Sequence, residues 1–253
     1  MIYKPFTPHK FHVAETKSTP KKTEVFKPKK CGEKTTHVVF ILDSSSSMSY
    51  NKDATISGYN EYLATQKAEA KESGIETVIS LYTFNGSGVK CVLDRVSSEE
   101  VKDLTTEDYN PNGMTNLFDA IGNVMFNVNH DLKRSKKENR DNIVITILTD
   151  GQENASKEFT NSDIKTMVEM AESKNWAFLF LGANINAFAL GSTFGMRNEN
   201  TIQYTMNNIS DAVALASVAT NKMKSGVRSG HSTVASYASA FNDADRAKVV
   251  KND

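Results

Sequence analysis

The sequence contains few cysteines, few prolines and no long apolar run. Its 253 residues include two cysteines, Cys31 and Cys91, together with five prolines and one tryptophan. Two isolated cysteines supply neither a disulfide framework nor a cysteine-based metal site, so we expect free thiols. No apolar run approaches the roughly 20 residues that cross a bilayer, so we expect no membrane span. The first residues also lack the apolar core of a secretory signal, so we expect a reducing, cytoplasmic location.

Charge is balanced overall but unevenly distributed. The 30 basic and 30 acidic residues give the whole chain no attraction to nucleic acid or membrane. Residues 1–34, however, hold nine lysines and three glutamates, a net charge of +6, and four of the five prolines. This composition predicts a basic arm that does not fold alone. The arm either keeps the chain in solution or makes assembly contacts with an acidic partner, and it lacks the interleaved aromatics of a nucleic-acid stacking platform.

From about residue 35 the hydrophobic pattern alternates between strand-like and helix-like segments. Apolar runs predict strands at about residues 37–42, 76–84, 89–94, 143–148, 176–182 and 201–205. Helical spacing of apolar side chains predicts helices at about 53–73, 117–128, 160–173, 186–195 and 209–223, and a short polar helix is expected from Ser97. This alternation is typical of an α/β fold with a mainly parallel sheet and helices on both faces.

Two further features define the organisation of the chain. The glycine-rich turn at 85–88 predicts that the third strand pairs antiparallel with the second, as a hairpin. The strand and helix patterns cover residues 35–222, which we assign to one domain. Residues 223–253 are rich in serine and alanine and weakly patterned, so we expect a partly ordered C-terminal tail.

Oxygen-bearing side chains occupy three loops at one end of the predicted sheet. Asp43, Ser45 and Ser47 follow the first strand, Thr115 precedes a helix, and Asp150 follows the fourth strand. In a doubly wound sheet, ligands bind outside the carboxyl ends of the strands, where the strand order reverses. Two carboxylates and several hydroxyls, with no histidine or cysteine nearby in the sequence, suit Mg²⁺ or Mn²⁺. We therefore expect a metal site between the first and fourth strands.

Each loop taken alone has a simpler interpretation. The serine run after the first strand reads as a polar loop, and the T-D-G sequence around Asp150 is a common turn. Thr115 fits the N-cap of the following helix. Asp53 and Asp119 are interpreted as acids in the first turns of helices and not as ligands. The coincidence of three such loops at one end of the sheet favours the metal site.

The same residues carry a resemblance to a known family. Asp43, Ser45 and Ser47 form D-x-S-x-S directly after an apolar strand, Thr115 lies in G-M-T-N-L-F-D-A-I, and Asp150 lies in I-L-T-D-G-Q-E-N. Over about residues 35–222, these motifs resemble the von Willebrand factor type A (vWA) domain and its metal-ion-dependent adhesion site. The sequence looks closest to stand-alone intracellular members encoded by bacteria and tailed bacteriophages. The resemblance implies a Rossmann-like, doubly wound sheet of six strands in the order 3-2-1-4-5-6, with strand 3 antiparallel.

The resemblance also implies a role for each candidate residue. Ser45 and Ser47 would bind Mg²⁺, or alternatively Mn²⁺, through their hydroxyls, and Thr115 would bind directly or through water. Asp43 and Asp150 would act mostly through water. Neutral hydroxyl ligands leave the dication electrophilic, and in the family the carboxylate of an Asp or Glu from a partner protein completes the coordination. This pattern includes no nucleophile or general base, so it implies a protein-binding module and not an enzyme.

Two other functions stay open. In a structural or assembly role, for example in a virion, the chain would be held by its tails and the metal site would be incidental. A phosphatase of the haloacid-dehalogenase type also places an aspartate after its first strand, but it needs a second aspartate where Ser45 stands. The sequence contains neither a Walker-type phosphate loop nor a G-x-S-x-G elbow.

Overall fold

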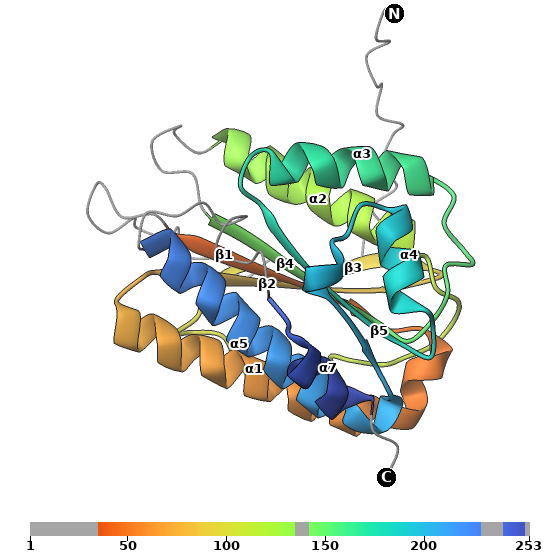
Figure 1. Cartoon of the computed structure of the whole chain (residues 1–253), viewed down its shortest axis with the longest axis horizontal. Helices are drawn as coiled ribbons and strands as arrows, with labels where there is room; N and C mark the ends of the chain where they lie inside the picture. The colour runs from red at the N-terminus through yellow and green to blue at the C-terminus, as the bar shows by residue number, and fades with distance from the viewer. Residues whose placement is uncertain (1–34, 135–141, 229–239, 251–253) are drawn as a thin grey trace, which may run out of the picture. The chain divides into compact units, whose positions relative to one another are not determined.

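The structure is built around a six-stranded sheet (Figure 1). This computed structural model describes residues 35–134, 142–228 and 240–250, so the expected arm at 1–34 and part of the expected tail lie outside the described residues. The strands are β1 (Thr36–Asp43), β2 (Thr77–Asn85), β3 (Gly88–Ser97), β4 (Asn142–Thr149), β5 (Ala177–Ala183) and β6 (Thr201–Tyr204). Their spatial order is β3-β2-β1-β4-β5-β6, with β2 and β3 antiparallel and all other neighbours parallel. The predicted doubly wound order and the antiparallel third strand are confirmed.

The central strands are buried on both faces. In β1, Val38, Phe40 and Leu42 belong to one hydrophobic core, and Val39 and Ile41 belong to the other. Successive side chains of a strand point to opposite faces of the sheet, so a strand between two cores needs apolar residues at every position. This explains the continuous apolar run in the sequence. β3, at the edge, is only partly buried and mixes charged with apolar residues.

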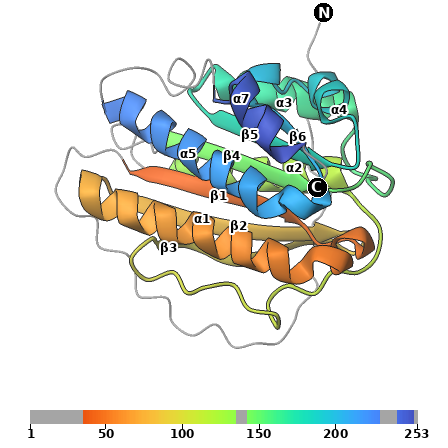
Figure 2. The ribbon, with the colours of Figure 1, turned by 60° about the horizontal axis from the view of Figure 1, so that its bottom comes forward.

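Helices cover both faces of the sheet (Figures 1 and 2). One face carries α1 (Lys52–Ser73), α5 (Ile209–Arg228) and α7 (Asp243–Val249), and the other carries α2 (Leu117–Arg134), α3 (Asn161–Glu172) and α4 (Ala187–Thr193). Short 3₁₀ helices are η1 (Ser46–Asn51), η3 (Asn198–Asn200) and η4 (Met206–Asn208). Within the described residues, no helix combines the length and apolar character that a bilayer crossing needs.

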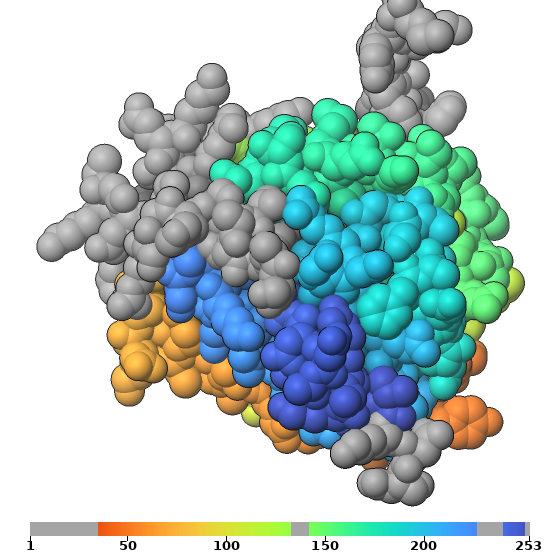
Figure 3. Space-filling model, in the orientation of Figure 1, coloured from red at the N-terminus to blue at the C-terminus, as the bar shows by residue number. Residues whose placement is uncertain are grey.

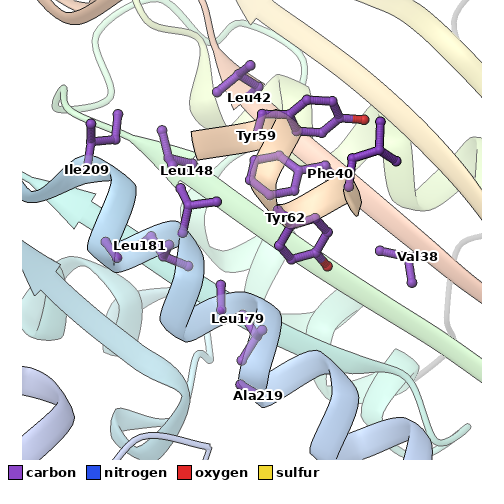
Figure 4. Close-up of a cluster of buried hydrophobic side chains, with 14 of the residues drawn as sticks. Val38, Phe40, Leu42, Tyr59, Tyr62, Leu148, Leu179, Leu181, Ile209 and Ala219 are labelled. Carbon is purple, nitrogen blue, oxygen red and sulfur yellow. The ribbon is translucent and has the colours of Figure 1, made fainter. Parts of the chain in front are cut away.

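Aromatic packing joins α1 to the centre of the sheet (Figure 4). The ring of Phe40 contacts the rings of Tyr59 and Tyr62 edge-on, with 5.3 Å between ring centroids in both pairs. Such edge-to-face pairs contribute about 0.5–1.5 kcal/mol beyond the burial of their area. Leu179 and Ala219 lie in the same cluster, so β1, β5, α1 and α5 share one core.

The short helix expected from Ser97 is wrong. β3 continues to Ser97, and residues 98–116 form turns and irregular backbone. The side chain of Asn60 in α1 explains the difference, because its Oδ1 accepts from the N–H of Leu104 at 2.8 Å and its Nδ2 donates to the Leu104 carbonyl at 3.0 Å. Tyr109 is also buried in the core. These tertiary contacts satisfy backbone groups that a helix would have used.

The C-terminal residues pack on the same face as α1 and α5. α5 extends beyond the domain boundary expected at residue 222, which therefore falls inside a helix. Phe241 and Val249 are buried. The N–H of Thr205 donates to the carbonyl of Val249 at 3.0 Å, and the N–H of Phe241 donates to the carbonyl of Glu199 at 3.1 Å. Figure 3 shows α7, in dark blue, packed against the lighter blue surface beside it.

A buried polar network links α1 to α5. The ammonium group of Lys224 is buried and forms an ion pair with Glu69, and it donates to Oε1 of Gln66 at 3.3 Å. The other end of that carboxamide donates to the hydroxyl of Ser217 at 3.3 Å. Burial lowers the pKa of Lys224, and Glu69 opposes this effect. The network fixes which residues of the two helices lie opposite each other, since its partners are spaced along both.

His37 is a buried histidine of β1 whose ring contacts β2 and β3. Its Nδ1 lies 3.1 Å from a guanidinium nitrogen of Arg95, and its Nε2 lies 2.8 Å from the hydroxyl of Ser80. A guanidinium group can only donate, so Nδ1 accepts and Nε2 carries the proton. Burial, aided by the charge of Arg95, lowers the pKa of His37 to about 3.

Acid should destabilise the protein through His37. In the unfolded chain this histidine titrates near its ordinary pKa of about 6.5, whereas in the folded protein it stays neutral down to about pH 3. Its contribution to stability is therefore complete above about pH 6.5 and is lost as the pH falls toward 3, by about 2 kcal/mol at about pH 5. Urea unfolding in EDTA should show a fall in unfolding free energy between about pH 7 and pH 5 that is about 2 kcal/mol smaller in His37→Gln. Equal pH dependence in both proteins would contradict this role.

Candidate metal centre

The ends of β1 and β4 bring two carboxylates to one edge of the sheet. Leu42 pairs with Leu148 in the parallel register, so the next residues, Asp43 and Thr149, lie together where the strands end. The Thr149 hydroxyl donates to Oδ2 of Asp43 at 2.6 Å, although the two residues are 106 positions apart in sequence. Asp150 follows directly. The two acids therefore meet where the strand order reverses, as the sequence predicts.

Asp43 is completely buried and held in one orientation. Its Oδ1 accepts from the N–H of Ser45 at 2.7 Å, and the hydroxyl of Tyr109 donates to its carbonyl oxygen at 2.6 Å. Burial raises the pKa of Asp43 to about 6, although the hydrogen bonds from Thr149 and Ser45 oppose this rise. A carboxylate in such surroundings is stabilised by a nearby positive charge.

A chain of hydroxyls connects the first loop to Asp150. The hydroxyl oxygens of Ser45 and Ser47 lie 3.1 Å apart, and the Ser47 hydroxyl donates to Oδ1 of Asp150 at 2.6 Å. Burial also raises the pKa of Asp150, and the hydrogen bond from Ser47 opposes this. Ser45 and Asp150 are buried, whereas Ser47 is exposed. The exposed Ser47 hydroxyl therefore links two buried residues, Ser45 and Asp150.

Thr115 reaches the same place from the loop before α2. Its N–H donates to Oδ1 of Asn154 at 2.9 Å, and its carbonyl oxygen accepts from the N–H of Asn154 at 3.0 Å. A side chain at Gly151 would place its Cβ 2.9 Å from the Thr115 hydroxyl and displace it, so glycine permits this close approach. The structure thus brings Thr115 beside the residue that follows Asp150.

Helix positions distinguish Thr115 from the neighbouring acids. α2 begins at Leu117, which makes Asn116 and not Thr115 the residue at the N-cap position. The simpler interpretation of Thr115 as a helix cap is therefore wrong. Asp119 and Asp53 lie in the first turns of α2 and α1, as predicted.

Sequence reasoning missed the residues that support the candidates. Thr149 and Tyr109 hold Asp43, and Asn154 holds Thr115. The T-D-G sequence offered a signal for Thr149, since a hydroxyl beside an acid at a strand end is visible in the sequence. Nothing marks Tyr109 or Asn154, because their partners are 66 and 39 positions away.

A divalent cation fits the chemistry of these donors. The group consists of two carboxylates and three hydroxyls, all of them hard oxygen donors, which suit Mg²⁺ or Mn²⁺ better than zinc or copper. In the described part of the chain, no three His, Cys, Asp or Glu side chains form a metal-binding group. A cation here would therefore depend on hydroxyl ligands. The two buried carboxylates supply negative charge to offset it.

Comparison with protein-family models matches residues 37–222 to the von Willebrand factor type A domain. Among solved structures, the pilus adhesin SpaC from Lactobacillus rhamnosus GG, in an open conformation, has a TM-score of 0.53 and 11% sequence identity, over 76% of this chain and 30% of that chain. The manganese-loaded TRAP protein of Plasmodium vivax has a TM-score of 0.48 and 14% identity, over 72% and 73% of the two chains.

A third similar structure is proximal thread matrix protein 1 from the mussel byssus, with a zinc-occupied MIDAS motif. Its TM-score is 0.43 and its identity is 16%, over 73% of this chain and 46% of that chain. The chain thus spans less than half of that protein, and at these identities the likeness concerns the fold. A search of curated proteins finds no significant match.

Proposed function

Because this chain belongs to the von Willebrand factor type A family, we propose that it is a metal-dependent protein-binding module and not an enzyme. The proposed cation is Mg²⁺, with Mn²⁺ as the alternative. Ser45 and Ser47 hold it directly, and Thr115 holds it directly or through water. Asp43 and Asp150 act mostly through water and orient the hydroxyls. The partner is a protein that presents an Asp or Glu carboxylate.

The feature that best supports this proposal is a donor group that is buried on one side and open on the other. Asp43 is buried beneath the group, whereas Ser47 is exposed and its hydroxyl bonds to Asp150. Neutral hydroxyl ligands leave much of the charge of a dication uncompensated. A carboxylate that arrives from the open side supplies that charge, so the arrangement favours recognition of acidic residues.

The donor group offers little to a hydrolytic reaction. The hydroxyls of Ser45 and Ser47 bond to each other and to Asp150, and the second acid of a haloacid-dehalogenase site is replaced by Ser45. Within the described residues no histidine joins the group, since His37 is buried between β1, β2 and β3, and His130 lies on α2. These features support binding and not catalysis.

Selection from displayed random peptides tests the proposed function. Peptides captured by the Mg²⁺-loaded protein and released with EDTA should share an Asp or Glu, because a carboxylate completes the coordination. Replacement of that acid by its amide should remove binding, as should Asp43→Ala in the protein. Binders that survive both EDTA and Asp43→Ala would contradict the proposal.

We also propose that the protein is of the vWA type encoded by bacteria and tailed bacteriophages, and that it acts in a bacterial cytoplasm or in a virion. The resemblance of its motifs to those members and the low cysteine content support this. Assembly contacts through residues 1–34 remain a prediction from the sequence, because those residues lie outside the described part of the chain.

A further inference from the structure

The loop between β4 and α3 is tied to the start of α2. Oε2 of Glu153 accepts from the N–H of Phe118 at 3.0 Å, and the hydroxyl of Ser156 accepts from the N–H of Asp119 at 3.0 Å. In return, the carboxylate of Asp119 accepts three backbone N–H groups of the loop, at 2.8–2.9 Å, from Lys157, Glu158 and Phe159. The loop is therefore held in one position relative to α2.

Side-chain packing fixes the far end of the same loop. The ring of Phe159 lies against Gly122 of α2, where a Cβ atom would come within 2.6 Å of the ring. Phe159 packs against the core formed on this face of the sheet. The loop thus has anchors on both sides of Asn154, at Glu153 and from Ser156 onward.

Asn154 is the residue of this anchored loop that forms hydrogen bonds with Thr115. The side-chain oxygen of Asn154 accepts from the N–H of Thr115 at 2.9 Å, and its backbone N–H donates to the carbonyl of Thr115 at 3.0 Å. Both backbone groups of Thr115 are therefore engaged by one residue. This leaves the Thr115 main chain little freedom to rotate, and its hydroxyl stays close to Gly151.

We propose that Asn154 is a positioning residue of the metal centre, which holds Thr115 through this two-way hydrogen bond and so sets the affinity for the divalent cation. The inference rests on the proposed function, because it assumes that Thr115 contributes to metal binding. Asn154 is exposed and lies outside the group of five donors. Its effect is exerted through Thr115, since the lost side-chain acceptor would leave the Thr115 N–H to water and free the hydroxyl to move.

Substitutions at Asn154 separate this role from a merely structural one. In Mg²⁺ titrations of the full chain followed by calorimetry, Asn154→Ala should raise the dissociation constant by about 10- to 100-fold, the usual effect of losing a residue that orients a metal ligand. Asn154→Asp keeps an acceptor for the Thr115 N–H, so its affinity should not fall below that of the wild type. Gln152→Ala, at an exposed position of the same loop, should leave the affinity unchanged.

Urea unfolding in EDTA provides the second measurement. A merely structural role for Asn154 would lower the stability of the metal-free protein and leave the dissociation constant unchanged, and that result would overturn the inference. A similar loss of affinity in Asn154→Ala and Asn154→Asp would also overturn it. If the wild type binds no Mg²⁺ or Mn²⁺, the proposed function fails and the inference fails with it. If the wild type binds and Asn154→Ala binds equally well, the inference alone fails.

Discussion

Replacing Asp150 by asparagine should abolish the stabilisation of this protein by Mg²⁺. Asn keeps the size of the side chain and an acceptor for the Ser47 hydroxyl, which donates to Asp150 at 2.6 Å, but it removes the charge that offsets a dication. At a concentration 100 times its dissociation constant, a bound ion stabilises the native state by about 2.7 kcal/mol. In thermal melts of the EDTA-stripped protein, added Mg²⁺ should therefore raise the melting temperature of the wild type and leave that of Asp150→Asn unchanged.

A second acid provides the matched control for this experiment. Asp53 lies in the first turn of α1 and is exposed, so Asp53→Asn makes the same change of charge outside the donor group. Its melting temperature should rise with Mg²⁺ as in the wild type. In EDTA, Asp150→Asn should be at least as stable as the wild type, because burial disfavours the Asp150 carboxylate. Equal Mg²⁺ shifts in the wild type and in Asp150→Asn would contradict the assignment.

Replacing Lys224 by alanine should destabilise the fold more than any surface substitution. Lys224 is 2% exposed and forms an ion pair with Glu69, so its removal leaves a largely buried carboxylate without its cation. Breaking a buried pair in this way costs about 3–5 kcal/mol. Urea unfolding in EDTA should report this loss as a lower midpoint with a similar slope.

Two further variants identify the ion pair as the cause. Lys222→Ala, at an exposed position two residues away on α5, should change the unfolding free energy by less than about 0.5 kcal/mol. Combining Lys224→Met with Glu69→Met should recover much of the loss, because apolar residues of similar volume often replace a buried ion pair without cost. A loss in Lys224→Ala no larger than that of Lys222→Ala would show that the pair is not energetically important.

The sequence predicts the sheet well because burial on both faces leaves a strong pattern. β1, β4 and β5 contain continuous apolar runs, since their apolar side chains alternate between the two cores. The glycine-rich turn before β3 marks the antiparallel hairpin. The spatial order of the strands is implied by the family resemblance alone, because the periodicity of apolar residues does not indicate which strands are neighbours. The structure supplies that order directly.

The local sequence pattern gives a wrong prediction where side chains distant in sequence replace local backbone hydrogen bonds. The segment after Ser97 has the composition of a short helix, but Asn60 takes both backbone groups of Leu104. Residue types and positions after strands or before a helix predict the candidate donors, and the structure brings all five loop residues together. Their supports were not found, because Tyr109 and Asn154 act on partners far away in sequence. Metal binding by the donors remains a proposal for the titrations above.

The pairing of Leu42 with Leu148 also determines when the proposed donors come together. Asp43 and Asp150 lie on segments that meet only after the central strands have paired. In an unfolded chain, Asp150 is therefore not held beside the D-x-S-x-S motif. We therefore expect the ion to bind the native state and not the unfolded chain. This is the condition for full stabilisation of a protein by its ligand. Loss of magnesium would then expose this protein to proteases, because the population of unfolded chains sets the rate of their degradation.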